Sequence, residues 1–391
     1  RGFGPVRFLS SLSVLVLTLG LLACPAPDPV VSDAGVRADA GPVVDAGDSV
    51  DAGGSVDAGM GLGTNCETSP NEDLGVCPAP PDAYQPRVNG SADDSWAACI
   101  SDDNTYHLAG DSTPSSVARV EAYDRIGALL WDKGIAPSPD DFVQAKLIYA
   151  EESGVGSRVA RRYDTHYDKP PNGASCQDEG VPAQYPDYCV GPATLEPLIN
   201  AAFLAGGQGV DPALNSARVR AALMWFYYVS AVKEGMSCAA KAKDCDSSWA
   251  YHTGGTTREA PIGLGRAIKR VAPETYNQAY DGNLAIRCWR DIDNAETAEQ
   301  LDLQERAVTQ LDVALIHGFA MIVKDELDHA DCSTGLYREA SLTFVRTVAP
   351  LFNRAFAQQD AAAAAAFLSG LEGDVNVPAV TAHVVRAFNC P

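Results

Sequence analysis

The stretch from Glu296 to Leu327 repeats apolar side chains at steps of three and four residues along its length. This spacing returns to one face of an α-helix, so it predicts a long helix with a buried stripe. The residues of the stripe are Leu303, Ala307, Leu311, Ala314, Gly318 and Met321. A helix with such a stripe needs other elements to cover it, which favours a helical bundle.

Other segments contain residues that are typical of helix starts. Ser138-Pro139-Asp140-Asp141 has a capping serine, a proline at the first helical position, and acids at the positive end of the helix dipole. Further helices are predicted over 114–133, 139–152, 212–235, 336–359, 360–371 and 378–388. Strand-like alternation is scarce. We therefore expect an all-α fold, a multi-helix bundle, over residues 114–391.

Residues 1–24 have the features of a bacterial export signal. Arg1 and Arg7 precede an apolar run over 9–22 that is too short for a stable membrane span. The run ends in Leu-Leu-Ala-Cys24, which resembles the lipobox whose cysteine is acylated in lipoproteins. We expect a lipid anchor on Cys24, and Pro25 after it favours the outer membrane. The alternative is an ordinary secretory signal with an incidental cysteine.

Residues 25–64 repeat Asp-Ala-Gly and contain almost no large apolar side chains. They predict a disordered acidic tether, since such a segment cannot bury a core. The spacing lacks the ligand density of a calcium loop. Residues 65–113, rich in Cys, Pro and Asp, are expected to be irregular and held by disulfides.

Eleven cysteines support export. Without Cys24, ten remain, an even number that is compatible with five disulfides in an oxidising compartment. Short-range pairing is plausible for Cys66–Cys77, Cys176–Cys189 and Cys238–Cys245. Long-range bonds would then use Cys99, Cys288, Cys332 and Cys390. The sequence contains no Cys-x-x-Cys pair, so a zinc site is not favoured.

The net charge of −22 argues against nucleic-acid binding, because the phosphate backbone would repel the chain. An acidic surface attracts cations. Partners are therefore expected to be a metal ion, the membrane through the lipid alone, and a surface or periplasmic protein.

Two clusters contain the candidate ligands: the first offers oxygen atoms of the kind that hard ferric iron favours, and the glycines of the second let the backbone approach a ligand closely. Tyr149 and Glu152 lie three residues apart and share a helix face. Asp246, Tyr251 and His252 precede paired glycines, with Glu259 downstream. The alternatives are a solvated helix end for the first cluster and a tight turn with a packed tryptophan for the second.

Two further clusters have similar composition. Tyr163-Asp164-Thr165-His166-Tyr167-Asp168 lies in the long, non-periodic segment 158–192, and Asp325-Glu326-Leu327-Asp328-His329 ends the longest helix. Ordinary polar loop contacts and exposed helix-end acids are the respective alternatives.

Several runs resemble one family: Ala145–Gly154, Asp246–Gly255, Pro261–Ala267, Tyr280–Trp289 and Gln310–Ala320. Together they are similar to the low-iron-inducible periplasmic (Fea-type) proteins of algal iron assimilation, over about residues 110–330. His252 departs from that pattern, where a tyrosine or another aromatic residue is expected. The resemblance implies an exported helical protein that handles iron outside the cytoplasm, and it supplies no ligand set.

The sequence thus predicts a lipid-anchored, non-enzymatic iron-binding or iron-assimilation protein. The candidate iron ligands are Tyr149, Glu152, Asp246, Tyr251, His252 and Glu259. A protein- or glycan-binding surface module that uses the 158–192 loop is the alternative. A metal-dependent enzyme using residues 246–259 is less expected, because no base–nucleophile constellation is present.

Overall fold

The computed structural model describes residues 63–68, 77–87, 96–151, 154–292 and 298–389. All of them belong to one compact unit, Ala58–Pro391. The predicted signal peptide, Cys24 and nearly all of the predicted tether therefore lie outside the described residues.

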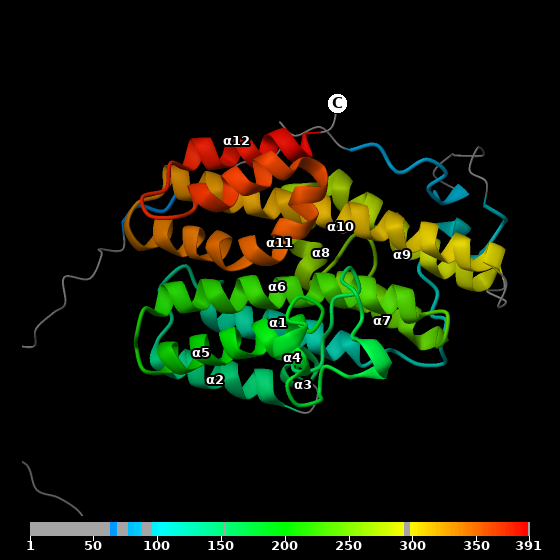
Figure 1. The fold of residues 1–391 in the computed structure, drawn as a ribbon, viewed down its shortest axis with the longest axis horizontal. Helices are drawn as coiled ribbons and strands as arrows, with labels where there is room; N and C mark the ends of the chain where they lie inside the picture. Colours follow the sequence, from blue (N-terminus) through cyan, green and yellow to red (C-terminus); the bar gives the residue numbers. More distant parts are fainter. Residues whose placement is uncertain (1–62, 69–76, 88–95, 152–153, 293–297, 390–391) are drawn as a thin grey trace, which may run out of the picture. The chain divides into compact units, whose positions relative to one another are not determined.

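The all-α prediction is confirmed: the described residues form α-helices and contain no strand (Figure 1). The helices are α1 (Ser116–Leu130), α2 (Pro139–Ala150), α3 (Gly156–Val159), α4 (Val181–Gln184), α5 (Glu196–Gly207), α6 (Pro212–Ser237), α7 (Ala242–Thr253), α8 (Gly263–Val271), α9 (Pro273–Asp291), α10 (Ala298–Cys332), α11 (Gly335–Gly370) and α12 (Val377–Phe388).

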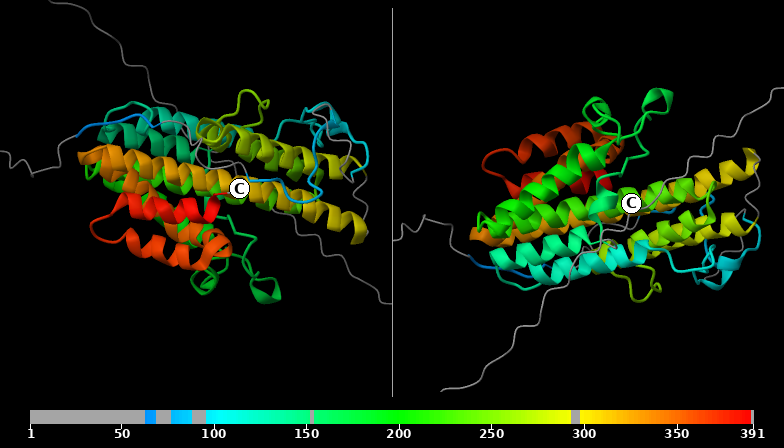
Figure 2. Two further views of the ribbon diagram at one scale, coloured as in Figure 1. Left: turned by 90° about the horizontal axis from the view of Figure 1, so that it is seen from above. Right: turned by 90° about the horizontal axis from the view of Figure 1, so that it is seen from below.

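Helix α10 lies at the centre of the packing and contacts α6, α8, α9, α11 and α12 (Figures 1 and 2). Its predicted stripe is buried at Ala307, Leu311, Ala314 and Met321. The portion Leu301–Cys332 is long and apolar enough to cross a membrane, but most of it is buried inside the bundle. A central core helix has the same composition, because it is covered on nearly all sides.

Two predicted boundaries are confirmed in detail. Ser138 Oγ accepts a hydrogen bond from the Asp141 amide, and the Asp141 carboxylate accepts one from the Ser138 amide. Within α11, Asp360 has the non-helical angles φ −153° and ψ 100°, and its carboxylate caps the next turn at Ala363. The predicted break between residues 359 and 360 thus has a local cause.

Helices α5, α7, α8 and α9 were not predicted from periodicity. In α7 and α9, polar side chains such as Asp246, His252 and Asn283 are buried together with apolar ones. Burial on several sides removes the contrast between an apolar and a polar face on which the periodic signal depends.

The disulfides partly match the expected pairing. Cys176–Cys189 and Cys238–Cys245 are present, and Cys99 bonds to Cys288. The predicted Cys66–Cys77 bond is wrong, since Cys66 bonds to Cys332 at the end of α10. The segment before α1 packs there: Thr64 and Thr334 exchange two hydrogen bonds. Contact across the fold, rather than closeness in sequence, decided this pair.

The irregular segment before α1 is also part of the core. The side chains of Tyr84, Trp96 and Tyr106 are buried. The only described helix in this segment is the short 3₁₀ turn Ile100–Asp103. The bundle therefore includes residues upstream of the start expected at residue 114.

Candidate functional site

Tyr149 lies in α2 and packs against Phe203 of α5, with 5.4 Å between the ring centroids. Its hydroxyl is buried and has no hydrogen-bond partner among the described residues. Burial raises the pKa of this phenol, so it stays protonated. Glu152, the predicted co-ligand, lies outside the described residues.

Asp246 is fully buried in α7, and both of its carboxylate oxygens are occupied. Oδ1 accepts hydrogen bonds from Tyr106 Oη at 3.1 Å and the Ala109 amide at 2.7 Å, and Oδ2 accepts one from the Gly110 amide at 2.8 Å. Burial raises the pKa of Asp246, and these donors oppose that shift. The carboxylate therefore anchors the segment before α1 to α7.

Tyr251 and His252 make separate contacts in α7. Arg162 lies over the Tyr251 ring, with its guanidinium carbon 5.4 Å from the centroid. His252 Nδ1 is 2.6 Å from Asn283 Oδ1, an acceptor, so Nδ1 carries the proton. Burial lowers the pKa of His252 to about 4. Glu259 is exposed in the loop before α8.

The predicted ligands that the structure describes therefore do not form one site. Among the described residues, no group of three or more His, Cys, Asp and Glu side chains is placed to hold a metal ion. Tyr149 belongs to the α2–α5 contact, while Asp246 and His252 are engaged by separate partners around α7.

A different constellation forms around His166 from the 158–192 segment. Its Nδ1 lies 2.6 Å from Asp164 Oδ1, and its Nε2 lies 2.9 Å from Asp312 Oδ2 in α10. Tyr228 in α6 donates a 2.7 Å hydrogen bond to Asp312 Oδ1, and Arg354 in α11 donates one to the Tyr228 oxygen at 3.2 Å. Four segments far apart in sequence thus meet at one imidazole.

The charges of this constellation are coupled. Burial disfavours the charged form of His166, but the hydrogen bonds to Asp164 and Asp312 outweigh it and raise the pKa to about 9. Burial likewise opposes ionisation of Asp312, yet His166 holds the pKa of that carboxyl below its usual value. Burial raises the pKa of Tyr228, which is therefore a neutral phenol here.

A pocket of about 340 Å³ opens beside His166 and Asp312. The other residues that line it are Thr165, Val232, Met236, Leu301, Gln304, Glu305, Val308 and Thr309. His166 and Asp312 are therefore reachable by a small molecule or ion, unlike the fully buried Asp246 and His252.

Sequence reasoning found one half of this constellation and missed the other. The run 163–168 was singled out for its composition, whereas Asp312 and Tyr228 were not. Asp312 follows Leu311 of the predicted apolar stripe, and an acid next to a buried stripe residue is the signal that could have found it.

The acidic run that ends α10 forms a second polar cluster, and its acids are not exposed. Asp325 pairs with Arg270 at 2.6 Å and Glu326 pairs with Arg220 at 2.6 Å, and both acidic side chains are buried. His329 Nε2 donates to the Cys66 carbonyl at 2.6 Å, while its Nδ1 lies 3.3 Å from Ser341 Oγ.

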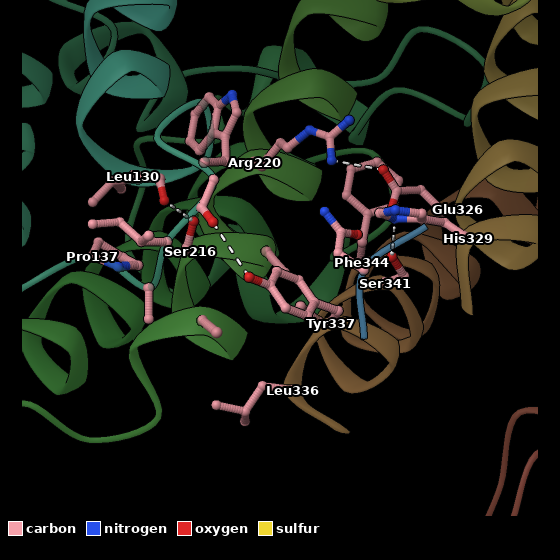
Figure 3. A pocket seen from close by; sticks show the side chains of 18 residues that line it. Leu130, Pro137, Ser216, Arg220, Glu326, His329, Leu336, Tyr337, Ser341 and Phe344 are labelled. Carbon is pink, nitrogen blue, oxygen red and sulfur yellow. Dashed lines mark hydrogen bonds and ion pairs between the residues drawn. The ribbon is translucent and has the colours of Figure 1, made fainter. Parts of the chain in front are cut away.

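Two adjoining hollows meet at these residues. The first, of about 190 Å³, is mainly apolar and is lined by Trp131, Ile135, Leu336, Tyr337 and Phe344, among others (Figure 3). The second, of about 450 Å³, is lined by Thr68, Arg270 and Asp325, among others. Both share Asn65, Arg220, Glu326 and His329. We call the two hollows together the chamber.

Comparison with known proteins identified no relative: no family model, curated protein or solved structure matches the chain.

Proposed function

We propose that the protein is an exported, lipid-anchored iron-binding protein without catalytic activity, and that ferric iron binds at His166, Asp312 and Tyr228. The observation that carries this proposal is the 2.9 Å separation of His166 Nε2 and Asp312 Oδ2 at the wall of an open pocket. Adjacent ligands of an octahedral metal with bonds of about 2.1 Å lie about 3 Å apart, so these two atoms have a suitable spacing.

The surrounding residues suit this role. Asp164 binds His166 Nδ1, so Nε2 is the nitrogen that would face a metal once its proton, now hydrogen-bonded to Asp312, is released. A carboxylate behind a ligating histidine is the usual supporting partner. Asp164 lies at Nδ1 and Asp312 at Nε2, on opposite sides of the ring. An ion bound to Nε2 can therefore contact Asp312 but not Asp164. The third ligand in the proposal is therefore the Tyr228 oxygen, which is buried behind the pocket wall and donates to Asp312 Oδ1, so an ion would reach it only past that carboxylate.

The ligand chemistry favours a hard cation. Carboxylate and phenolate oxygens suit ferric iron, and a bound cation ionises groups that burial keeps neutral. Arg354 beside the Tyr228 oxygen also favours the phenolate. The net charge of −22 supports accumulation of cations near the protein.

Titration of the full chain with ferric nitrilotriacetate tests the proposal, with binding followed by the visible absorption of a ferric phenolate. We expect saturable 1:1 binding. Asp312→Asn and Tyr228→Phe should each weaken it by roughly 10–100-fold. Tyr251→Phe, which alters another buried tyrosine near α6, should leave binding unchanged.

Binding no stronger than that of an unrelated acidic protein would exclude the proposal. Equal loss of iron affinity in Tyr251→Phe and Tyr228→Phe would exclude the assigned site.

The alternative prediction is that the 158–192 loop is a protein- or glycan-binding surface. Deletion of the loop would then abolish capture of a partner.

A further inference from the structure

The chamber has a polar end and an apolar end, and Arg220 is one of the residues that line both. The Arg220 guanidinium carbon lies 5.0 Å from the centroid of Phe344, whose ring lines the apolar hollow. Figure 3 shows Arg220 and Glu326 joined across the chamber, with Phe344 beside them. Stacking on Phe344 and pairing with Glu326 hold the guanidinium in place.

Three carboxylate oxygens at the polar end already accept hydrogen bonds, while Glu67, which also lines this hollow, is exposed to solvent. Asp325 Oδ1 accepts from the Thr68 hydroxyl at 2.6 Å, and Oδ2 accepts from Arg270 at 2.6 Å. Glu326 Oε1 accepts from Arg220 at 2.6 Å.

Hydrogen-bond donors at the polar end are mostly unused. A guanidinium carries five N–H groups. Arg220 and Arg270 each make a single hydrogen bond to the described residues. The hydrogen-bonding groups of the two guanidinium ions that make no bond to the protein are therefore cationic N–H donors. Such donors match the two oxygens of a carboxylate.

We propose that the chamber binds an organic acid, with an aromatic or aliphatic body between Trp131 and Phe344 and a carboxylate at Arg220 and Arg270. The combination of an apolar hollow with a few convergent polar groups is typical of small-molecule sites. This site shares no residue with the His166 constellation and does not depend on iron binding.

Calorimetry with the full chain in metal-free buffer tests the proposal with 4-phenylbutyrate as the probe. The matched comparator is 4-phenylbutan-1-ol, which keeps the apolar body and lacks the carboxylate. We expect 1:1 binding of the acid and at least about tenfold weaker binding of the alcohol, because charge-assisted hydrogen bonds to the guanidinium groups are lost.

Two arginines of α8 provide a matched pair of variants. Arg270 pairs with Asp325 in the chamber, whereas Arg266 pairs with Asp124 outside it, and their side chains are 53% and 51% exposed. Arg270→Gln should weaken binding of the acid about tenfold, and Arg266→Gln should leave it unchanged. Ala340→Phe, which fills the apolar hollow, should remove binding of both probes in a variant that still unfolds cooperatively.

Three results would overturn the inference. The first is the absence of 1:1 binding of 4-phenylbutyrate. The second is equal affinity for the acid and the alcohol. The third is an equal effect of Arg266→Gln and Arg270→Gln.

Discussion

His166 and Asp312 are 146 positions apart in sequence, and their side chains meet at 2.9 Å. This contact fastens the long 158–192 segment to the central helix α10. Removing one partner of a fully buried charge pair typically costs about 3–5 kcal/mol. The cost here should be smaller, because these side chains are 15% and 24% exposed and His166 keeps Asp164 as a partner. The contact therefore has a structural consequence whether or not a metal binds there.

We expect Asp312→Ala to lower the free energy of unfolding by about 2 kcal/mol, since it leaves His166 Nε2 and the Tyr228 hydroxyl without their acceptor. Urea denaturation measures this loss. Asp328→Ala in the same helix is the control: its carboxylate is 33% exposed and pairs with Lys324, so the cost should stay below about 1 kcal/mol. Equal losses in the two variants would contradict the assigned role of Asp312.

His252 should make stability depend on pH. Its pKa is lowered from 6.5 to about 4 in the folded state, so between these values only the unfolded state takes up the proton. Stability from this residue is complete above pH 6.5 and is lost as the pH falls towards 4, by about 3 kcal/mol. In His252→Gln, the fall in unfolding free energy between pH 7 and pH 4 should shrink by that amount. An identical fall in unfolding free energy in the wild-type protein and in His252→Gln would refute this role of His252.

Gly254 ends α7 with φ +79°, and an added Cβ would lie 1.9 Å from Ile262 Cγ1. Gly254→Ala should therefore combine backbone strain with a steric clash and cost about 3 kcal/mol or more. Gly134 has φ +69° and open space around it, so Gly134→Ala isolates the backbone contribution, about 1 kcal/mol. Thermal unfolding should separate the two variants. A cost for Gly254→Ala no larger than that for Gly134→Ala would be inconsistent with the clash.

Disulfide mapping provides a direct check of the topology. Non-reducing digestion and mass spectrometry should recover the Cys66–Cys332 and Cys99–Cys288 peptides. Double substitution of Cys66 and Cys332 by serine should cost about 4 kcal/mol in unfolding free energy, because the bond closes a loop of more than 200 residues. Recovery of a Cys66–Cys77 peptide instead would show that the segment before α1 packs differently.

Cys24→Ala should move the protein from the membrane fraction to the soluble fraction of cells, since the proposed anchor is the acylated cysteine. Fractionation with labelled palmitate reports both the lipid and the location. Pro25→Asp keeps Cys24 and should keep the lipid, while it changes the membrane to which the protein is sent. Persistent membrane association of Cys24→Ala would rule out a lipid anchor at this residue.

Several features of the fold can be predicted from short stretches of sequence. Ser138 with Asp141, the acid at Asp360 and the apolar stripe of α10 act over a few residues, so they predict helix starts, breaks and faces correctly. The short-range disulfides Cys176–Cys189 and Cys238–Cys245 were predicted correctly for the same reason.

The sequence alone therefore determined the helical class, local boundaries such as those at Ser138 and Asp360, and the residue types available for a site. Tertiary structure decided which of those residues meet. Asp246 accepts hydrogen bonds from three donors of the segment before α1, and Tyr149 packs against Phe203 of α5. Cys66 bonds to Cys332, and His166 lies beside Asp312. The physical reason is that a helix start or face is set by neighbours along the chain, whereas a ligand cluster depends on the packing of whole helices.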